Sequence, residues 1–180
     1  VVGPVRALLL GERTALNFLQ QLSGTATLTR KLVDAVKDFS CKVLDTRKTT
    51  PGLRTLQKYA VRMGGGTNHR IGLYDAALVK DNHIEATGSI ADAVKAVRRH
   101  APFMAKVEVE AGNLKQVQEA IDAGADVIML DNMNLAQMAE AVKLINKRAG
   151  VEASGGITLD SIRQVAETGV DFISSGALTH

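Results

Sequence analysis

The stretch Gly124-Ala125-Asp126-Val127-Ile128 returns later in the chain as Gly169-Val170-Asp171-Phe172-Ile173. In both copies a glycine ends a helical pattern, and an apolar, strand-like run follows at once. The two copies are about two repeat units apart, which is the spacing that repeated β/α units produce. The chain is therefore expected to be built from such units.

The same alternation of strand-like and helical patterns continues on both sides of this repeat. Alternating strands and helices specify a parallel sheet with helices packed outside it. Strands are expected over residues 42–46, 76–80, 106–110, 127–130, 151–154 and 172–175, and helices over residues 53–63, 89–99, 114–123, 135–147 and 159–167.

The predicted fold class is α/β: a TIM-like (β/α) barrel, open or incomplete, with at least six parallel strands. A doubly wound sheet is the competing architecture. The barrel is favoured because polar residues follow every predicted strand, whereas a doubly wound sheet gathers them at one switch point. Residues 1–180 are interpreted as one barrel domain, with residues 1–38 as a helical lead-in that Ser23-Gly24 divides into two patterns.

Composition excludes several classes of function. Of the 180 residues, 46% are hydrophobic, which is ordinary for a globular domain, and no run is apolar and long enough for a membrane span. Aromatic residues make up only 3% and the net charge is +3, so nucleic acid is a poor candidate ligand. The single cysteine, Cys41, rules out an internal disulfide and favours a reducing, cytoplasmic location.

Cationic residues gather in the loops and strand ends of the first half. Arg47, Lys48, Arg70 and Lys80 hold such positions, and arginine with lysine suits a ligand that carries carboxylates and phosphates. His69 lies within this cationic loop and is expected to share the site. Two other cations of this segment, Arg54 and Lys58, are instead expected on a solvated helix face, while His83 is left undecided.

Carboxylates follow the later strands. Glu110 and Asp131 are expected at the same mouth, where two carboxylates beside a polyphosphate usually hold Mg²⁺. Alternatively they bind ribose hydroxyls, offset positive charge at a reacting carbon, or form a salt bridge to Lys80 or Arg70. Glu108 shares the strand face of Glu110 and is a possible neighbour. The chain shows neither a His/Cys cluster for zinc nor a nucleophile.

Glycine-rich turns follow the last two predicted strands. They comprise Ser154-Gly155-Gly156, with Thr158 as a possible helix N-cap, and Ser175-Gly176. Exposed backbone N–H groups and a helix dipole at the last strands of a barrel are typical of a phosphate site. The run Gly64-Gly65-Gly66 has no strand before it, and it is interpreted as a helix stop and a mobile loop.

In order along the chain, these motifs resemble the quinolinate phosphoribosyltransferase family. The resemblance covers the whole length. It rests on residues 11–17 (GERTALN), 44–52 (LDTRKTTPG), 64–66 (GGG), 68–70 (NHR), 79–83 (VKDNH), 107–110 (VEVE), 130–132 (LDN), 151–157 (VEASGGI) and 176–179 (GALT).

The resemblance implies the transfer of a phosphoribosyl group from phosphoribosyl pyrophosphate to quinolinate, with decarboxylation to nicotinate mononucleotide. It also implies a homodimer in which Arg13 reaches the neighbouring subunit's site. The implied catalytic residues are Lys48, Lys80, Glu110 and Asp131, the last two with Mg²⁺. The implied substrate-binding residues are Arg13, Arg47, His69, Arg70, Ser154, Gly155, Gly156, Ser175, Gly176 and His180.

Two alternatives stay open: a paralogous barrel linked to molybdate uptake, and a non-catalytic barrel that binds a phosphate ligand. The family has a separate N-terminal domain that covers the barrel mouth. The chain begins at Val1 and lacks most of that domain, so it is expected to be a piece of a longer protein and to be inactive by itself.

Overall fold

The structure is a computed structural model that describes residues 1–180. Six parallel strands form one curved sheet in the order β1-β6-β5-β4-β3-β2. The strands are β1 (Lys42–Leu44), β2 (Ala76–Val79), β3 (Lys106–Ala111), β4 (Val127–Asp131), β5 (Gly150–Ser154) and β6 (Phe172–Ser174).

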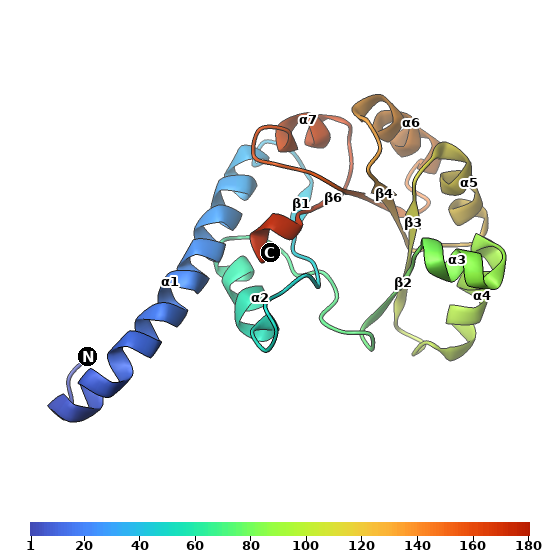
Figure 1. Cartoon of the computed structure of the whole chain (residues 1–180). Helices are drawn as coiled ribbons and strands as arrows, with labels where there is room; N and C mark the ends of the chain where they lie inside the picture. Colours follow the sequence, from blue (N-terminus) through green and yellow to red (C-terminus); the bar gives the residue numbers. More distant parts are fainter.

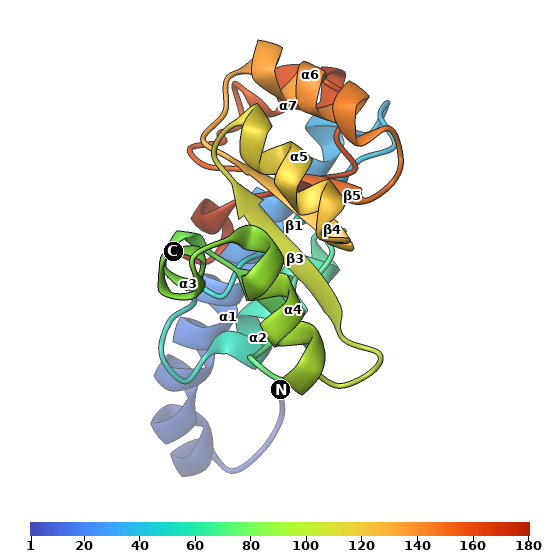
Figure 2. The same ribbon diagram turned by 90° about the vertical axis from the view of Figure 1, so that its right-hand side faces the viewer.

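The helices surround the outside of this curved sheet (Figure 1; Figure 2 shows the same arrangement from the side). They are α1 (Val5–Ala35), α2 (Arg54–Met63), α3 (Asp81–Thr87), α4 (Ile90–His100), α5 (Leu114–Asp122), α6 (Leu135–Ile145) and α7 (Ile162–Glu167). The short 3-10 helix η1 (Gly176–Leu178) follows β6 and lies on the cavity side. None of the helices has both the length and the apolar character that a membrane span requires.

The strand order confirms the barrel and excludes the doubly wound sheet. Strands β2 to β6 follow one another in chain order, and β1 lies beside β6, so no reversal of strand order occurs. The sheet does not close, because β1 and β2 are not paired. At this open seam Leu44 of β1 forms only an isolated parallel bridge with Thr67. The predicted open barrel is therefore found.

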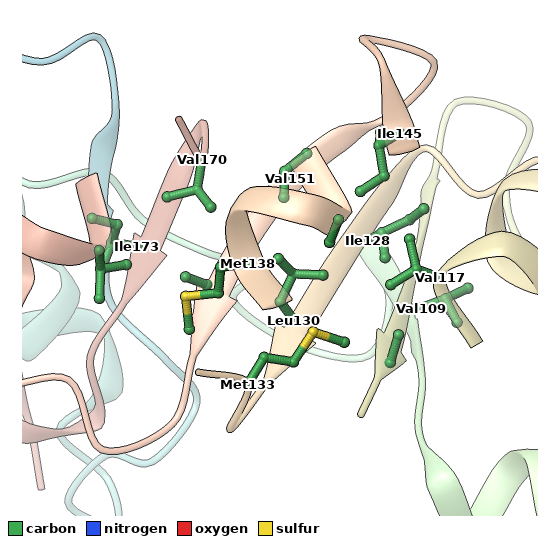
Figure 3. Close-up of a cluster of buried hydrophobic side chains, with 14 of the residues drawn as sticks. Val109, Val117, Ile128, Leu130, Met133, Met138, Ile145, Val151, Val170 and Ile173 are labelled. Carbon is green, nitrogen blue, oxygen red and sulfur yellow. The ribbon is translucent and has the colours of Figure 1, made fainter. Parts of the chain in front are cut away.

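The two faces of the sheet differ in chemistry because successive side chains of a strand point to opposite sides. Val107 and Val109 of β3 point outward and are fully buried against the helices. Figure 3 shows this apolar layer, in which Ile128 and Leu130 of β4 pack with residues of α5 and α6. The opposite face of the sheet carries most of the polar side chains of the strands, together with Leu78 and Met129, and this face lines the barrel interior.

Three local predictions were wrong. Helix α1 runs unbroken through Ser23-Gly24, because a helix-interior glycine costs only about 1 kcal/mol and the second half of α1 is anchored by burial of Thr25, Thr29 and Leu32. Helix α3 was not predicted, and it follows β2 directly after Lys80. Helix α7 begins at Ile162 rather than near residue 159.

The run Gly64-Gly65-Gly66 ends α2, as predicted, but it also forms a close contact with α1. A Cβ atom on Gly64 would lie 2.5 Å from the carbonyl oxygen of Ala26 and 2.6 Å from Cβ of Thr29. On Gly66 a Cβ would lie 2.8 Å from Cγ2 of Thr29. The glycines therefore permit the turn after α2 to pack against α1, a role that the mobile-loop interpretation missed.

We expect Gly64→Ala to lower the free energy of unfolding by about 1–3 kcal/mol, because its methyl group overlaps backbone atoms of α1. Gly24→Ala is the matched control. It lies within α1, a Cβ there meets nothing within 4 Å, and it should raise stability by roughly 0.5–1 kcal/mol. Urea unfolding measures both. Equal effects of the two substitutions would contradict the proposed packing.

Candidate active site

One cavity of about 910 Å³ opens at the carboxyl ends of the strands. Its size is suited to a small organic ligand together with a sugar phosphate. All but one of the predicted site residues line it: Arg47, Lys48, His69, Arg70, Lys80, Glu110, Asp131, Ser154, Gly155, Gly156, Ser175, Gly176 and His180. The structure thus brings together residues from every strand end.

Arg13 is the exception. It lies in the first half of α1, where its side chain is exposed, and it does not line the cavity of its own chain. Figure 1 shows this half of α1 extending away from the barrel. Whatever Arg13 binds therefore lies outside the cavity that the other residues form.

Arg47 and Arg70 lie on the cationic side of the cavity, and their surroundings favour the binding of an anion. Burial, together with repulsion from the charge of Arg47, lowers the pKa of Arg70, and the charges of Glu108 and Asp75 offset this only in part. Nε of Arg47 is buried and has no hydrogen-bond partner. An unpaired buried donor costs free energy. A ligand carboxylate or phosphate would relieve both costs at once.

A buried ion pair holds the loop that carries these cations. The carboxylate of Asp45, fully buried after β1, pairs with Nζ of Lys58 and accepts the backbone N–H of His69 at 2.9 Å. Nζ of Lys58 also donates to the carbonyl oxygen of His69 at 2.9 Å. The prediction that Lys58 lies on a solvated helix face was wrong, because this face of α2 packs on the loop.

Arg54 has a related role and was also misplaced. Its guanidinium donates to Oγ1 of Thr49 at 3.1 Å and to the carbonyl oxygens of Arg47 and Ile71, both at 3.3 Å. Instead of facing solvent alone, it ties the loop after β1 to the segment before β2. Side chains of α2 therefore fix both the loop after β1 and the segment before β2.

The acidic side is formed by Glu110 of β3 and Asp131 of β4. Oε2 of Glu110 lies 3.1 Å from Nζ of Lys80, so the salt bridge that the sequence left open is present. Because the Lys80 side chain is 47% exposed, this ion pair adds little stability and is easily exchanged for a ligand. Asp131 accepts a hydrogen bond from Asn132 at 2.9 Å.

The glycine-rich turns face the cavity through their backbone. Gly155 has φ +101, and a Cβ atom there would overlap the Asn132 side chain, so only glycine fits. The predicted helix dipole is not part of this turn, because α7 begins only at Ile162. Thr158 is not its N-cap either: its N–H donates to Oγ of Ser161 at 3.0 Å. Phosphate binding here would rest on backbone N–H groups alone.

Glu152 is the main cavity residue that sequence reasoning missed. It lies in the middle of β5, is only 1% exposed and lines the cavity floor. An acidic residue at an inward position of a buried strand was the available signal, and Glu108 of β3 carries the same one. Other lining residues that were missed are small or apolar side chains, such as Leu78, Met129 and Ser174.

His69 joins these two carboxylates. Its Nε2 lies 2.8 Å from Glu108 and 3.4 Å from Glu152. Burial alone would lower the pKa of His69, but the hydrogen bonds and charges of both carboxylates outweigh it and raise the pKa to about 10. Burial raises the pKa of Glu108, and Glu152 adds to this effect, while the bond from His69 offsets it only in part.

Two further candidates have structural positions. Nδ1 of His83 accepts the backbone N–H of Lys80 at 3.0 Å and thereby starts helix α3. Cys41 precedes β1 and does not line the cavity, and burial raises the pKa of its thiol. Neither residue contributes a nucleophile to the cavity.

Residues 25–180 match the family described as "Quinolinate phosphoribosyl transferase, C-terminal domain". The chain belongs to the quinolinate phosphoribosyl transferase family. A Synechocystis relative, named probable nicotinate-nucleotide pyrophosphorylase (carboxylating), is 54% identical across 98% of this chain and 61% of its own length. A tobacco quinolinate phosphoribosyltransferase (decarboxylating), of mitochondrial type, is 42% identical across the whole chain and 56% of its own length.

Solved structures agree with this assignment. The crystal structure of NadC from Streptococcus pyogenes superposes with a TM-score of 0.94 at 52% identity, over 99% of this chain and 62% of that one. The chain thus spans about three-fifths of the length of these relatives.

We expect Asp45→Asn to lower the free energy of unfolding by about 3–5 kcal/mol, because it leaves the buried Lys58 ammonium without a counter-charge. Asp34→Asn is the control, since the Asp34–Arg30 pair is more than half exposed and should contribute about 0–1 kcal/mol. Both variants are measured by urea unfolding. If Asp45→Asn unfolds like the control, the ion pair does not hold the loop.

Proposed function

We propose that this chain is the barrel part of an enzyme that transfers a phosphoribosyl group from phosphoribosyl pyrophosphate to quinolinate and releases CO2, giving nicotinate mononucleotide for de novo NAD biosynthesis. The supporting observation is the single cavity, cationic on one side and acidic on the other, formed by residues of all six strand ends. Family membership narrows the ligands to a pyridine diacid and a sugar pyrophosphate.

The cationic side would bind the anions. Arg47 and Arg70 are placed to take the quinolinate carboxylates, since guanidinium groups bind planar carboxylates through two hydrogen bonds, and Lys48 is placed to take the leaving pyrophosphate. Backbone N–H groups near Gly155 and Gly176 would take the 5′-phosphate. Such binding fixes the pyridine nitrogen beside C1 of the ribose, and this orientation is the enzyme's first contribution to rate.

The first chemical step breaks the bond between C1 and the pyrophosphate oxygen, and the pyridine nitrogen forms the new bond to C1. Positive charge builds on the ribose ring as the pyrophosphate leaves. The carboxylates of Glu110 and Asp131 would stabilise that charge, and Lys80 and Lys48 would stabilise the departing anion. No covalent enzyme intermediate is required for this displacement.

Decarboxylation follows from the new charge on the pyridine nitrogen. The bond from C2 to its carboxylate breaks, CO2 leaves, and the electron pair stays on C2, where the adjacent cationic nitrogen stabilises it. A proton then adds to C2. The side chains need only bind and orient the ring during this step, because the ring itself carries the electronic driving force.

Mg²⁺ belongs to the proposal, and the donors present fit it. Glu110 and Asp131 offer carboxylate oxygens at one cavity wall, which is the ligand type that Mg²⁺ prefers alongside substrate oxygens. Glu110 is engaged only by the exposed ammonium of Lys80, so its oxygens can be released to a cation. When bound, the ion would neutralise charge on the pyrophosphate.

A homodimer in a cytoplasmic setting is also proposed. The first half of α1 exposes apolar side chains, among them Leu9, Leu10, Leu16 and Leu19, together with Arg13. Such a surface on a helix that extends away from the barrel suits contact with a second copy. The cation Arg13 would then reach the partner's cavity. A reducing location is consistent with the single cysteine, Cys41.

The proposal is tested by product formation in a chain extended to the full length of its relatives. With phosphoribosyl pyrophosphate and Mg²⁺, quinolinate should give nicotinate mononucleotide and one CO2, whereas nicotinate as control substrate should release none. Substituting Lys80→Ala or Arg70→Ala should lower turnover at least 100-fold, because each removes a charged contact in the transition state. Wild-type turnover in both variants, with normal folding, would refute the site assignment.

The dimer is tested by mixing two inactive variants. A subunit with Arg13→Ala keeps its own cavity intact but should deprive its partner's cavity of a cation. A subunit with Lys80→Ala has a damaged cavity of its own but still supplies Arg13 to its partner. After mixing and reassembly, about a quarter of all sites should combine an intact barrel with an intact Arg13, and activity should return to that level. No recovery, despite exchange of subunits shown by mass measurement, would place Arg13 outside the site.

A further inference from the structure

His69 is held through both ring nitrogens. Nε2 faces the carboxylates of Glu108 at 2.8 Å and Glu152 at 3.4 Å, while Nδ1 accepts the backbone N–H of Arg70 at 2.8 Å. The backbone of His69 is held as well, by Asp45 and Lys58. This side chain therefore links the acidic floor of the cavity to the backbone of Arg70.

The contact with Arg70 decides where the ring carries its proton. A nitrogen that accepts an N–H cannot itself carry a proton, so Nδ1 is unprotonated in this arrangement. A neutral imidazole then has its proton on Nε2, directed at the two glutamates. Despite burial, the two carboxylates raise the pKa of His69 to about 10, which favours a second ring proton on Nδ1. That proton would break the Arg70 contact but would leave the proton on Nε2 in place. The Nε2–H bond to the floor is common to both charge states.

The same argument weighs against a metal ion in this cluster. Nε2 of His69 and one oxygen from each glutamate lie within 4.8 Å of one another, which is close enough for ligands of one ion. However, a metal on Nε2 would move the proton to Nδ1, where it would meet the N–H of Arg70. The Nε2 proton of His69 is therefore the donor that Oε2 of each glutamate faces, while Oε1 of each glutamate is buried without a partner.

We propose that Glu152 and Glu108 are positioning residues that act through His69: they hold its Nε2–H in either charge state and so keep the His69 ring beside Arg70 on the quinolinate-binding side of the cavity. This inference rests on the proposed function. In metal sites, carboxylates that orient a histidine in this way change affinity or activity by roughly 10- to 100-fold when they are removed, and an effect of that order is expected here. The effect here should be confined to quinolinate, because His69 touches none of the glycine-rich turns.

The test compares Glu152→Gln and Glu108→Gln with the control Glu140→Gln, a charge removed from the exposed surface of α6. Calorimetry with the full-length protein gives the Kd of quinolinate and, separately, of phosphoribosyl pyrophosphate with Mg²⁺. We expect Kd for quinolinate to rise about tenfold or more in both floor variants, while Kd for phosphoribosyl pyrophosphate changes less than about threefold. Equal weakening of both ligands, or no change beyond the control, overturns the proposal.

Two measurements remain informative if a floor variant folds poorly. Nitrogen-15 shifts of the wild-type imidazole should show a proton on Nε2, and a proton-free Nε2 or a Zn²⁺-dependent change of that shift would overturn the inference. His69→Gln, whose amide N–H can replace Nε2–H, should bind quinolinate more tightly than His69→Asn. The reverse order also overturns it. Because none of these readouts needs turnover, they stay separate from a failure of the proposed reaction.

Discussion

Buried charge must be paired, and this constraint organises the whole inner face of the barrel. Burial of the apolar outer face of the sheet stabilises the fold, so the inner face can carry Glu108, Glu110 and Glu152. Each of these carboxylates needs a cation or a donor close by. Lys80 and His69 supply them from segments that are distant in sequence. Removing either side would leave a charge without a partner.

The same rule explains how the cationic loop is held in place. Asp45 forms an ion pair with Lys58. Asp45 accepts a hydrogen bond from the backbone N–H of His69, and Lys58 donates one to the carbonyl oxygen of His69. The site thus has a cationic side and an acidic side, and the same barrel holds both. Preorganisation of this kind lowers the entropy that substrates must lose on binding.

Most of the fold could be predicted from the sequence, since strand and helix patterns are local. The six strands lie within one or two residues of their predicted bounds. The repeat around Gly124 and Gly169 correctly indicated β/α units, and the polar residues after every strand correctly favoured the barrel. The continuous α1 could not be predicted, because burial of Thr25 and Thr29 against α2 is a tertiary effect that overrides the propensity of Gly24. Helix α3 was not predicted because it is too short to show a helical pattern in the sequence.

The site residues, too, could be predicted where the signal is local and not where it depends on tertiary contacts. Residues at strand ends were identified because parallel strands end at one rim. Lys58 was misjudged, since a cation on an amphipathic helix looks solvated until its partner Asp45 is placed in space. Glu152 was missed although strand alternation places it on the same face as Ser154, because only residues at the strand ends were considered. Pairings across long sequence separations are visible only once the backbone is folded.

The unpaired seam between β1 and β2 has one further consequence. Segment 45–75 leaves the sheet at β1 and returns at β2, and it touches the ladder only at Thr67. Length changes in the exposed turn around Leu73 and Tyr74 therefore shift no strand register. The barrel can tolerate a longer or shorter turn on that flank, while the remaining strands stay locked to their neighbours.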